Sequence, residues 1–201
     1  ILGVEVRMRG AMPAQKTLLA VSNHLGLLDT LVLASQLPVA FAAKAEIARW
    51  PVINWICRVV GVIFVKRERF MQTGAFVEQV QTRLREGVCV LVFPEGTTSN
   101  GLDLLPFKTG AFAAVADMVG AAVLPLYLEG ISVDGYPAEG AHLQHLIWSQ
   151  GVPMMKHAWD LLGRRKIVME VRIGEPIATA DRDRKELARL SFDAMASLRK
   201  S

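Results

Sequence analysis

The sequence predicts an α/β fold: a mostly parallel central sheet flanked by helices. Short apolar runs alternate along the chain with longer amphipathic segments, the order typical of α/β layers. Several of the short runs are β-branched and almost continuously apolar, as in strands covered on both faces. Glycines separate neighbouring segments, at Gly61, Gly87, Gly120 and Gly174.

Strands are expected where apolar residues run together, at Val4–Arg9, Leu18–Ser22, Val39–Ala43, Val62–Lys66, Val88–Phe93, Ala122–Leu128 and Ile167–Ile173. Helices are expected where apolar residues recur at helical spacing, at Leu27–Leu37, Ala45–Val60, Phe70–Arg85, Thr109–Val119, Pro153–Leu162 and Arg182–Arg199. Pro125 interrupts one strand, and a proline there is typical of an edge, a bulge or a strand start. The segment Gly130–Gln150 shows neither pattern clearly.

Length and composition predict one folded domain. The chain has 201 residues, and we expect a single domain over 1–201. A hydrophobic content of 52% against 21% charged residues excludes the disordered class. The two cysteines, Cys57 and Cys89, exclude a disulfide framework and a Cys-rich zinc site. Cys89 lies in an apolar run and is expected to be a buried thiol.

The charge balance favours acidic partners. A net charge of +4 and a pI near 9.3 suit nucleic acid, anionic lipid or phosphorylated ligands. Nucleic acid is disfavoured because aromatics are 7%, the cations are scattered and no recognition motif appears. No stretch has the roughly 18–20 apolar residues of a membrane span. The chain opens on Ile1, which leaves a membrane anchor upstream open.

A polar cluster, Ser22-Asn23-His24, ends one apolar strand and leads to Asp29 in the next helix. Histidine is the side chain best suited to general-base chemistry near neutrality, and a nearby carboxylate can orient it. Residues five apart on one helix lie about 140° apart around the axis, so these two cannot meet within a helix. They can meet if His24 precedes the helix and Asp29 lies in its first turn, with Asn23 as the cap. An ordinary capped helix start explains the same residues.

Two further clusters follow strands. Phe93-Pro94-Glu95-Gly96-Thr97-Thr98-Ser99 comes after a buried strand, where open α/β sheets bind ligands. Gly61-Val62-Ile63-Phe64-Val65-Lys66-Arg67 ends in two cations, and arginine suits forked binding of phosphate or carboxylate. Each cluster alone is also compatible with a solvated loop.

In this order, the motifs resemble those of the glycerolipid acyltransferases of the lysophosphatidic acid type: N-H-x-x-x-x-D, G-x-I-F-x-x-R, F-P-E-G-T-R-S and a V-P-type strand motif. They stand here as Asn23-His24 with Asp29, Gly61 to Arg67, Phe93 to Ser99, and Val123-Leu124-Pro125-Leu126. The motif-bearing core covers about residues 18–128. The resemblance implies an acyltransferase-like layered domain and a membrane-associated enzyme at the cytoplasmic face.

The implied reaction moves a fatty acyl chain from a thioester, acyl-CoA or acyl carrier protein, to the hydroxyl of a lysolipid. By resemblance His24 is the general base and Asp29 orients it. Arg67, Glu95, Gly96, Thr97 and Thr98 would bind the acceptor. The thioester is already activated, so no protein nucleophile and no cofactor are required. The sequence agrees, since no G-x-S-x-G elbow occurs.

One position departs from the family pattern. Thr98 stands where the third motif usually has arginine, so a fixed guanidinium for an acceptor phosphate is missing. Asn23, Lys66 and Lys108 are auxiliary candidates, and the two lysines or Arg67 could supply the charge. The main expectation is 1-acylglycerol-3-phosphate as acceptor. The alternatives are lyso-ornithine lipid, which has an amino-acid head group, and a non-catalytic lipid-binding module of the same fold.

Two amphipathic segments suit a membrane surface because they combine tryptophan with cations. The first carries Arg49, Trp50, Trp55 and Arg58, and the second is Pro153–Leu162 with the cations that follow it. Each is equally typical of a helix packed on the sheet. No metal is expected at His24, Asp29 and Glu95, because hard-cation sites usually gather more oxygen ligands.

Overall fold

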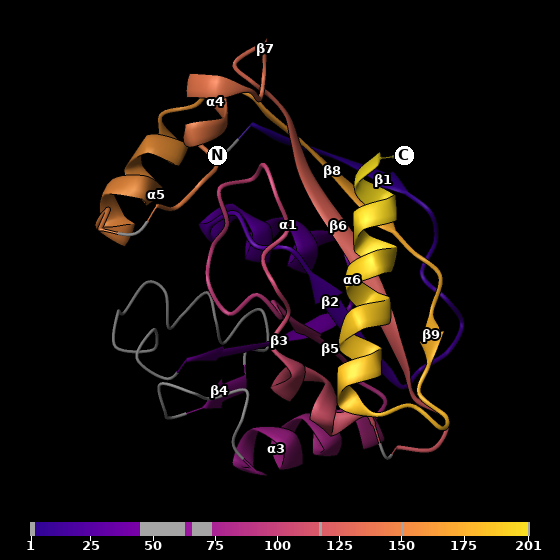
Figure 1. Cartoon of the computed structure of the whole chain (residues 1–201). Coiled ribbons are helices and arrows are strands. Elements are labelled where there is room, and N and C mark those ends of the chain that lie inside the picture. Colours follow the sequence, from indigo (N-terminus) through magenta and orange to yellow (C-terminus); the bar gives the residue numbers. More distant parts are fainter. Residues whose placement is uncertain (1–2, 45–62, 66–73, 117, 150, 201) are drawn as a thin grey trace.

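A twisted sheet of nine strands runs through the computed structural model, which describes residues 3–44, 63–65, 74–116, 118–149 and 151–200. Helices pack on both faces of the sheet (Figure 1). The strands are β1 (Val4–Arg9), β2 (Leu18–Ser22), β3 (Val39–Lys44), β4 (Ile63–Val65), β5 (Cys89–Val92), β6 (Ala122–Val133), β7 (Tyr136–Pro137), β8 (Ile167–Ile173) and β9 (Ile177–Ala178). The helices are α1 (Leu27–Gln36), α3 (Gly74–Arg85), the 3₁₀ helix η3 (Thr109–Ala114), α4 (Gly140–Gln144), α5 (Met154–Leu162) and α6 (Arg184–Lys200).

The sheet is mostly parallel, as the sequence predicted. Its order is β1-β8-β6-β2-β5-β3-β4, and β7 and β9 also pair with β6. β2 lies between β5 and β6, parallel to both. The long strand β6 pairs antiparallel with β8, which in turn pairs parallel with β1. The ends of β2 and β5 therefore meet at one edge of the sheet, and the polar clusters that follow them are brought together there.

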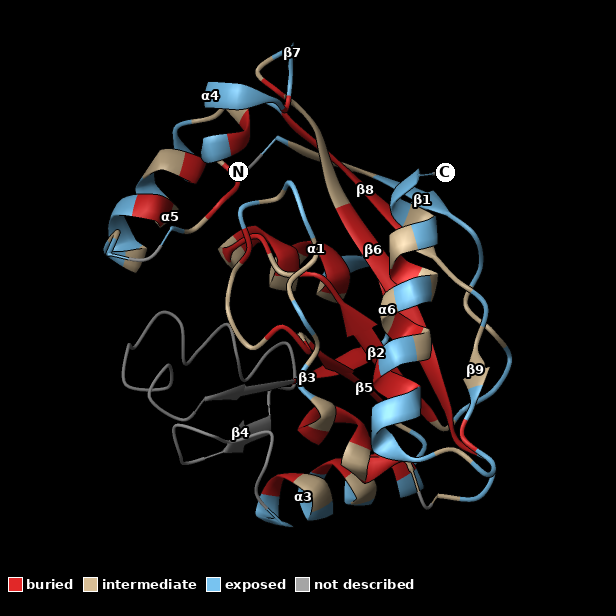
Figure 2. Cartoon of the chain, in the orientation of Figure 1, coloured by how far each residue is buried: buried red, intermediate tan, exposed pale blue. Residues whose placement is uncertain are grey.

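Two apolar clusters cover the two faces of the sheet. Side chains of a strand alternate between faces, and β2 shows this directly. Leu18 and Ala20 join the cluster with α1, whereas Leu19 and Val21 join the cluster with α3, η3 and α6. Every residue of β2 is buried (Figure 2). The near-continuous apolar pattern of this strand follows from its central position.

Pro125 lies inside β6, where its missing amide hydrogen does not disrupt the hydrogen bonding of the sheet. On one side of β6, Ala122 and Val123 pair with β9, and pairing with β8 starts at Leu126. Pro125 stands between these two partners and its carbonyl accepts a hydrogen bond from the amide of Gly174. A residue without an amide hydrogen fits this position because no neighbouring strand requires one from it there.

Two described parts of the chain differ from what the sequence predicts or leaves unassigned. The predicted helix Thr109–Val119 is a 3₁₀ helix that ends at Ala114, since its buried small residues allow a tight turn to pack closely on the sheet. Gly130–Gln150 contains the end of β6, the β7 hairpin and α4. The predicted helix Ala45–Val60 and the first residues of Phe70–Arg85 lie outside the described residues.

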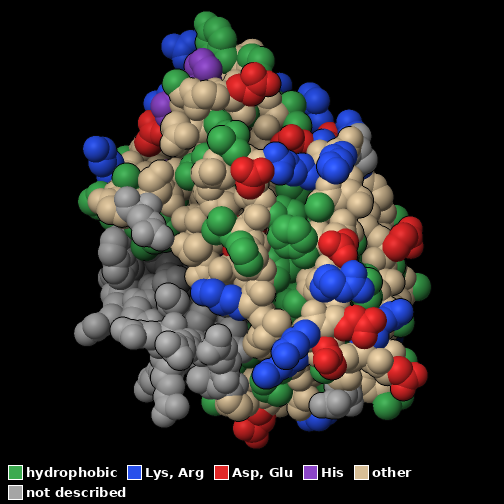
Figure 3. Space-filling model, in the orientation of Figure 1, with side chains coloured by type: hydrophobic (Ala, Val, Ile, Leu, Met, Phe, Trp, Pro, Cys, Tyr) green, Lys and Arg blue, Asp and Glu red, His purple; other side chains and the backbone are tan. Residues whose placement is uncertain are grey.

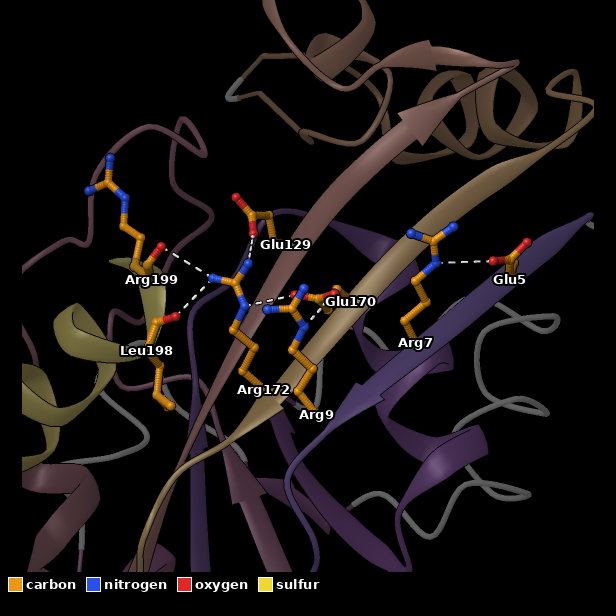
Figure 4. A network of polar contacts seen from close by, with 8 residues as sticks. All are labelled: Glu5, Arg7, Arg9, Glu129, Glu170, Arg172, Leu198 and Arg199. Atoms are coloured by element: carbon orange, nitrogen blue, oxygen red, sulfur yellow. Dashed lines mark hydrogen bonds and ion pairs between the residues drawn. The ribbon is translucent and has the colours of Figure 1, made fainter. Parts of the chain in front are cut away.

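A network of polar contacts attaches the end of α6 to the sheet (Figure 4). Arg172 of β8 pairs with Glu170 at 2.8 Å and with Glu129 of β6 at 2.5 Å. Its guanidinium also donates to the carbonyls of Leu198 and Arg199 at 2.8 and 3.2 Å. A cation at the carbonyl end of a helix satisfies unpaired acceptors and complements the helix dipole. The network therefore fixes the end of α6 against β6 and β8.

Candidate active site

The His24 turn, residues 23–26, connects β2 to α1. Asn23 fixes its start, because its amide group donates to the carbonyl of Leu128 and accepts from the Leu128 amide, both at 2.8 Å. The Asn23 side chain thereby continues the pairing of β2 with β6 beyond the last strand residue. Both polar atoms of Asn23 are used within the protein, so it serves to hold the turn in place.

His24 and Asp29 meet across this turn. The distance from His24 Nδ1 to Asp29 Oδ2 is 2.8 Å, and the Asp29 side chain is 1% exposed against 22% for His24. Asp29 Oδ2 also accepts from the amides of Leu25 and Gly26, at 2.5 and 2.9 Å. His24 precedes the helix and Asp29 lies in its first turn, which is the arrangement the spacing required.

The carboxylate fixes the state of the imidazole. An ionised carboxylate can only accept, so the proton of a neutral His24 ring lies on Nδ1. Nε2 then carries the lone pair that a general base needs. The ring of Phe93 stacks on the His24 ring with centroids 4.0 Å apart and planes 12° from parallel. Contacts on Nδ1 and on one ring face thus orient the imidazole before any substrate binds.

The turn after β5, residues 94–99, is tied to the His24 turn. The amide of Ser99 donates to the carbonyl of His24 at 2.7 Å. Thr98 Oγ1 donates to the carbonyl of Trp148 at 2.7 Å, and the Trp148 amide donates to the carbonyl of Leu25 at 2.8 Å. The Thr98 hydroxyl is therefore used to join three segments. Thr97 lies beside it and is half-buried.

Lys108 lies over Gly96. The φ of Gly96 is +70°, in the region that favours glycine, and a Cβ there would fall 2.9 Å from Lys108 Cε and closer still to Nζ. The backbone of Lys108 is anchored by a 2.8 Å hydrogen bond from its amide to the carbonyl of Pro94. Lys108 is exposed, so its ammonium group is available at the surface of the 94–99 turn.

Glu95 is buried, at 2% exposure. Neither carboxyl oxygen has a hydrogen-bond partner of regular geometry among the described residues. Burial raises the pKa of this carboxyl to about 8, while the backbone amides of Leu105 and His24 offset part of the rise and Asp29 adds to it. The carboxyl is therefore neutral at pH 7 and can donate one hydrogen bond. In this structure the Glu95 carboxyl group is buried inside the protein and does not reach solvent.

We expect Glu95→Gln to remove a pH dependence of stability. Between the ordinary pKa of 4.5 and about 8, folded Glu95 retains a proton that the unfolded chain has released. The unfolding free energy therefore falls as pH rises through this window, by about 3 kcal/mol at pH 7. Glutamine has the same shape and no titration, so urea unfolding of the variant should show a flatter profile. Glu175→Gln, at an exposed position, is the matched control; an unchanged slope in Glu95→Gln contradicts this reading.

Gly26 is where α4 and α5 approach the His24 turn. A Cβ at Gly26 would fall 2.7 Å from the Leu146 carbonyl oxygen and 2.9 Å from His157 Nε2. The close contact is what requires glycine here. The backbone angle does not, since a φ of 179° is extended and open to any residue. Trp148, His157 and Phe93 thus support the site, although the sequence motifs predicted no role for them. The role of Phe93 could have been inferred from its position directly before Pro94, at the end of a buried strand.

Several candidate residues lie outside the described residues: Arg67, Lys66, Arg49, Trp50, Trp55 and Arg58. Their assignments stay predictions. Within the described ranges, no three His, Cys, Asp or Glu side chains are grouped so as to hold a metal ion. Burial raises the pKa of the Cys89 thiol to about 11, so this cysteine is protonated and unsuited to nucleophilic chemistry.

Comparisons with known proteins agree with this arrangement. The acyltransferase family model matches residues 3–129, a range that contains both polar turns. The lyso-ornithine lipid O-acyltransferase of Rhizobium meliloti (strain 1021) is 34% identical over 198 residues, covering 94% of this chain and 68% of the relative. The 1-acyl-sn-glycerol-3-phosphate acyltransferase of Neisseria gonorrhoeae is 35% identical over 127 residues, covering 63% of this chain and 49% of the relative.

The fold is similar to that of a solved structure. The 1-acyl-sn-glycerophosphate (LPA) acyltransferase PlsC from Thermotoga maritima superposes with a TM-score of 0.70 at 23% identity, over 99% of this chain and 73% of that one. The shared fold, the family match over most of the chain and the two relatives together confirm the expected family. The chain belongs to the acyltransferase family and is an acyltransferase.

Proposed function

We propose that this chain transfers a fatty acyl group from a thioester to the hydroxyl of a lysolipid with an amino-acid head group. His24 Nε2 takes the hydroxyl proton as the oxygen attacks the thioester carbonyl. The tetrahedral intermediate collapses, the C–S bond breaks and the new ester bond remains. The leaving thiolate takes the proton from His24, which returns to its neutral state. The negative charge of Asp29 stabilises the imidazolium between these steps.

The observation that carries this reaction is the 2.8 Å contact between His24 Nδ1 and Asp29 Oδ2. The carboxylate oxygen is itself held by two backbone amides, so little reorganisation accompanies proton transfer. A lipid-binding module without catalysis would need neither the fixed tautomer nor the partly exposed ring. The thioester, acyl-CoA or acyl carrier protein, is a co-substrate, and the proposed steps require no cofactor.

The threonine at position 98 is evidence for an acceptor with an amino-acid head group. The family pattern has arginine at this position, which would offer a forked donor to a phosphate monoester. Here the hydroxyl of Thr98 is bonded to the carbonyl of Trp148. Among the residues that the structure describes, Lys108 places one ammonium group over Gly96, and one such cation matches a carboxylate better than a dianionic phosphate. The Rhizobium relative, a lyso-ornithine lipid O-acyltransferase by name, matches nearly the whole chain.

A second candidate acceptor is 1-acylglycerol-3-phosphate, because the Neisseria relative carries that activity in its name. A direct test offers the purified chain an acyl-CoA with lyso-ornithine lipid or 1-acylglycerol-3-phosphate, and follows thiol release and product mass. We expect kcat/KM to be higher for lyso-ornithine lipid. A preference for the phosphate acceptor would overturn the head-group proposal and leave acyl transfer standing. Release without a lipid product would contradict acyl transfer to lipid.

We expect Lys108→Met to raise the KM for the acceptor by about tenfold, the size of a lost charge-assisted hydrogen bond. The KM for acyl-CoA should change little, because the proposed role of Lys108 is to bind the head group. Lys16→Met is the matched control, since this exposed lysine precedes β2 at the opposite end of that strand. Equal effects of Lys108→Met on both substrates would argue against a head-group role.

The acceptor and its acyl chain reside in a bilayer, so the proposed enzyme works at a membrane surface, on the cytoplasmic side where its thioester donors are made. None of the described helices is both long and apolar enough to cross a bilayer. Arg49, Trp50, Trp55 and Arg58 are the membrane contacts predicted from the sequence, and they stay a prediction.

A further inference from the structure

One face of α5 exposes three large apolar side chains. Met155, Trp159 and Leu162 are 43%, 67% and 46% exposed, and we call them the α5 stripe. At about 100° per residue, positions 155, 159 and 162 fall within about 60° around the helix axis. The stripe is therefore continuous along the helix. Hydrophobic side chains clustered in this way mark a contact surface more often than isolated ones do.

The opposite face of α5 packs on the candidate active site. His157 and Leu161 are buried, and His157 Nε2 lies 2.9 Å from the position of a Cβ on Gly26. Burial lowers the pKa of His157, so the ring packs as a neutral group at pH 7. The loop before α5 contributes the 2.8 Å hydrogen bond from the Trp148 amide to the Leu25 carbonyl. One short helix thus connects the α5 stripe to the His24 turn.

Basic side chains flank the stripe. Lys156 follows Met155 and Arg165 follows the end of the helix, and both are exposed. The acidic residue of the helix, Asp160, is paired with His145 and Arg164, at 2.7 and 3.0 Å. Apolar and basic side chains lie together at the left edge of the space-filling view, where α5 is placed in Figure 1 (Figure 3). A tryptophan on an apolar face with neighbouring cations suits an anionic lipid interface.

We propose that the α5 stripe lies on an anionic bilayer and so places the His24 turn next to its lipid acceptor. This inference rests on the proposed function, which requires a lipid surface. A stable dimer usually buries about 800 Å² on each partner, more than three side chains supply. An acidic carrier protein would pair with Lys156 and Arg165 but leaves the apolar stripe without a role. A bilayer accommodates both features.

The binding test uses the 201-residue chain and flotation with vesicles of phosphatidylglycerol and phosphatidylcholine. The triple variant Met155→Gln, Trp159→Gln, Leu162→Gln replaces the stripe with good helix formers and no change of charge. We expect its vesicle binding to weaken by about tenfold or more, since two or three side chains lose their apolar contact. Lys156→Gln with Arg165→Gln should weaken binding to anionic vesicles and leave binding to pure phosphatidylcholine unchanged.

The matched control is Val119→Gln, which also removes an exposed apolar side chain, 101% exposed. Val119 precedes the start of β6, whereas α4 and α5 follow its far end (Figure 1). This control should bind vesicles as the wild type does. Circular dichroism and the melting temperature confirm that each variant is folded, because all substituted positions are at the surface.

An activity assay separates this inference from the proposed function. With a short-chain acceptor dissolved below its micelle concentration, the triple variant should match the wild type. With the acceptor embedded in vesicles, its transfer rate should fall in proportion to binding. If the wild type transfers to neither acceptor, the proposed function fails and the flotation result still tests the stripe.

Five outcomes would overturn the inference. Three concern vesicles: no binding by the wild type, equal binding by the triple variant, and an equal loss in the control. A fourth is a wild-type dimer that the triple variant dissociates without a change in vesicle binding. A fifth is a triple variant that loses affinity for acyl carrier protein and keeps its vesicle affinity, which would assign the stripe to the donor.

Discussion

His24→Ala should lower kcat for acyl transfer by about a thousandfold and leave the melting temperature nearly unchanged. The loss follows from removing Nε2, the atom placed to take the acceptor proton; general-base catalysis typically contributes about 10²–10⁴. The fold should persist because the His24 ring is partly exposed, and because alanine keeps the backbone carbonyl that accepts from the Ser99 amide. Thiol release with a saturating acceptor measures kcat, and thermal unfolding measures stability.

The chain provides a matched control for this variant. His145 Nδ1 pairs with Asp160 Oδ2 at 2.7 Å, a second partly exposed histidine–aspartate pair with the same connectivity. It joins α4 to α5 and is not part of the His24 turn. His145→Ala should therefore keep its kcat. A rate in His24→Ala equal to that of the wild type, or an equal loss in His145→Ala, would remove His24 from the role of base. An unfolded His24→Ala would assign the residue to the fold.

Much of the site was predictable because its residues are local in sequence. His24 and Asp29 belong to one strand–turn–helix unit, and the spacing of five residues required one of them to precede the helix. The turn after β5 was predictable because its residues, Phe93 to Ser99, follow a buried strand and stand in order with the His24 motif. The parallel order of strands followed from their near-continuous apolar composition.

The support behind the site was not predictable, because it is assembled over long separations. Gly26 contacts His157 and the carbonyl of Leu146, more than a hundred residues along the chain. No periodicity or motif links those positions. The two hydrogen bonds between the Asn23 side chain and the Leu128 backbone were not predictable either, because a side chain here takes the place of a strand residue in pairing with β6. Asn23 was expected as a helix cap, and its amide instead extends a sheet.

The protonation state of Glu95 was also not predictable from the sequence. As a motif residue it was expected to bind the acceptor, and a carboxylate in a turn after a strand is ordinarily ionised. Its burial at 2% exposure, with the neighbouring Asp29 charge, raises its pKa to about 8. Sequence indicates the residue type at this position, whereas its pKa depends on burial in the folded chain, which the amides of Leu105 and His24 only partly offset.

Two replacements of Asp29 should separate the effect of its negative charge on kcat from the effect of its hydrogen bonds. All three hydrogen bonds of this carboxylate converge on Oδ2, and Oδ1 is buried without a partner among the described residues. In Asp29→Asn the amide oxygen must take the Oδ2 position, because an NH₂ there would face three donors. The contacts and the His24 tautomer are then kept, and the negative charge is lost. We expect kcat to fall by about a hundredfold, since an imidazolium beside a neutral amide is less stabilised.

Asp29→Ala removes the acceptor altogether. The amides of Leu25 and Gly26 and the Nδ1 of His24 then lack a partner in a mostly buried turn, and each orphaned group costs about 1–3 kcal/mol. The melting temperature should therefore fall further than in Asp29→Asn, and kcat should fall to the level of His24→Ala because the ring is no longer held. Measuring kcat and thermal unfolding for both variants side by side distinguishes the two contributions. If Asp29→Asn retained full activity, the carboxylate would serve as a helix cap that positions His24, and the charge on the imidazolium would have to be stabilised by other groups around the turn.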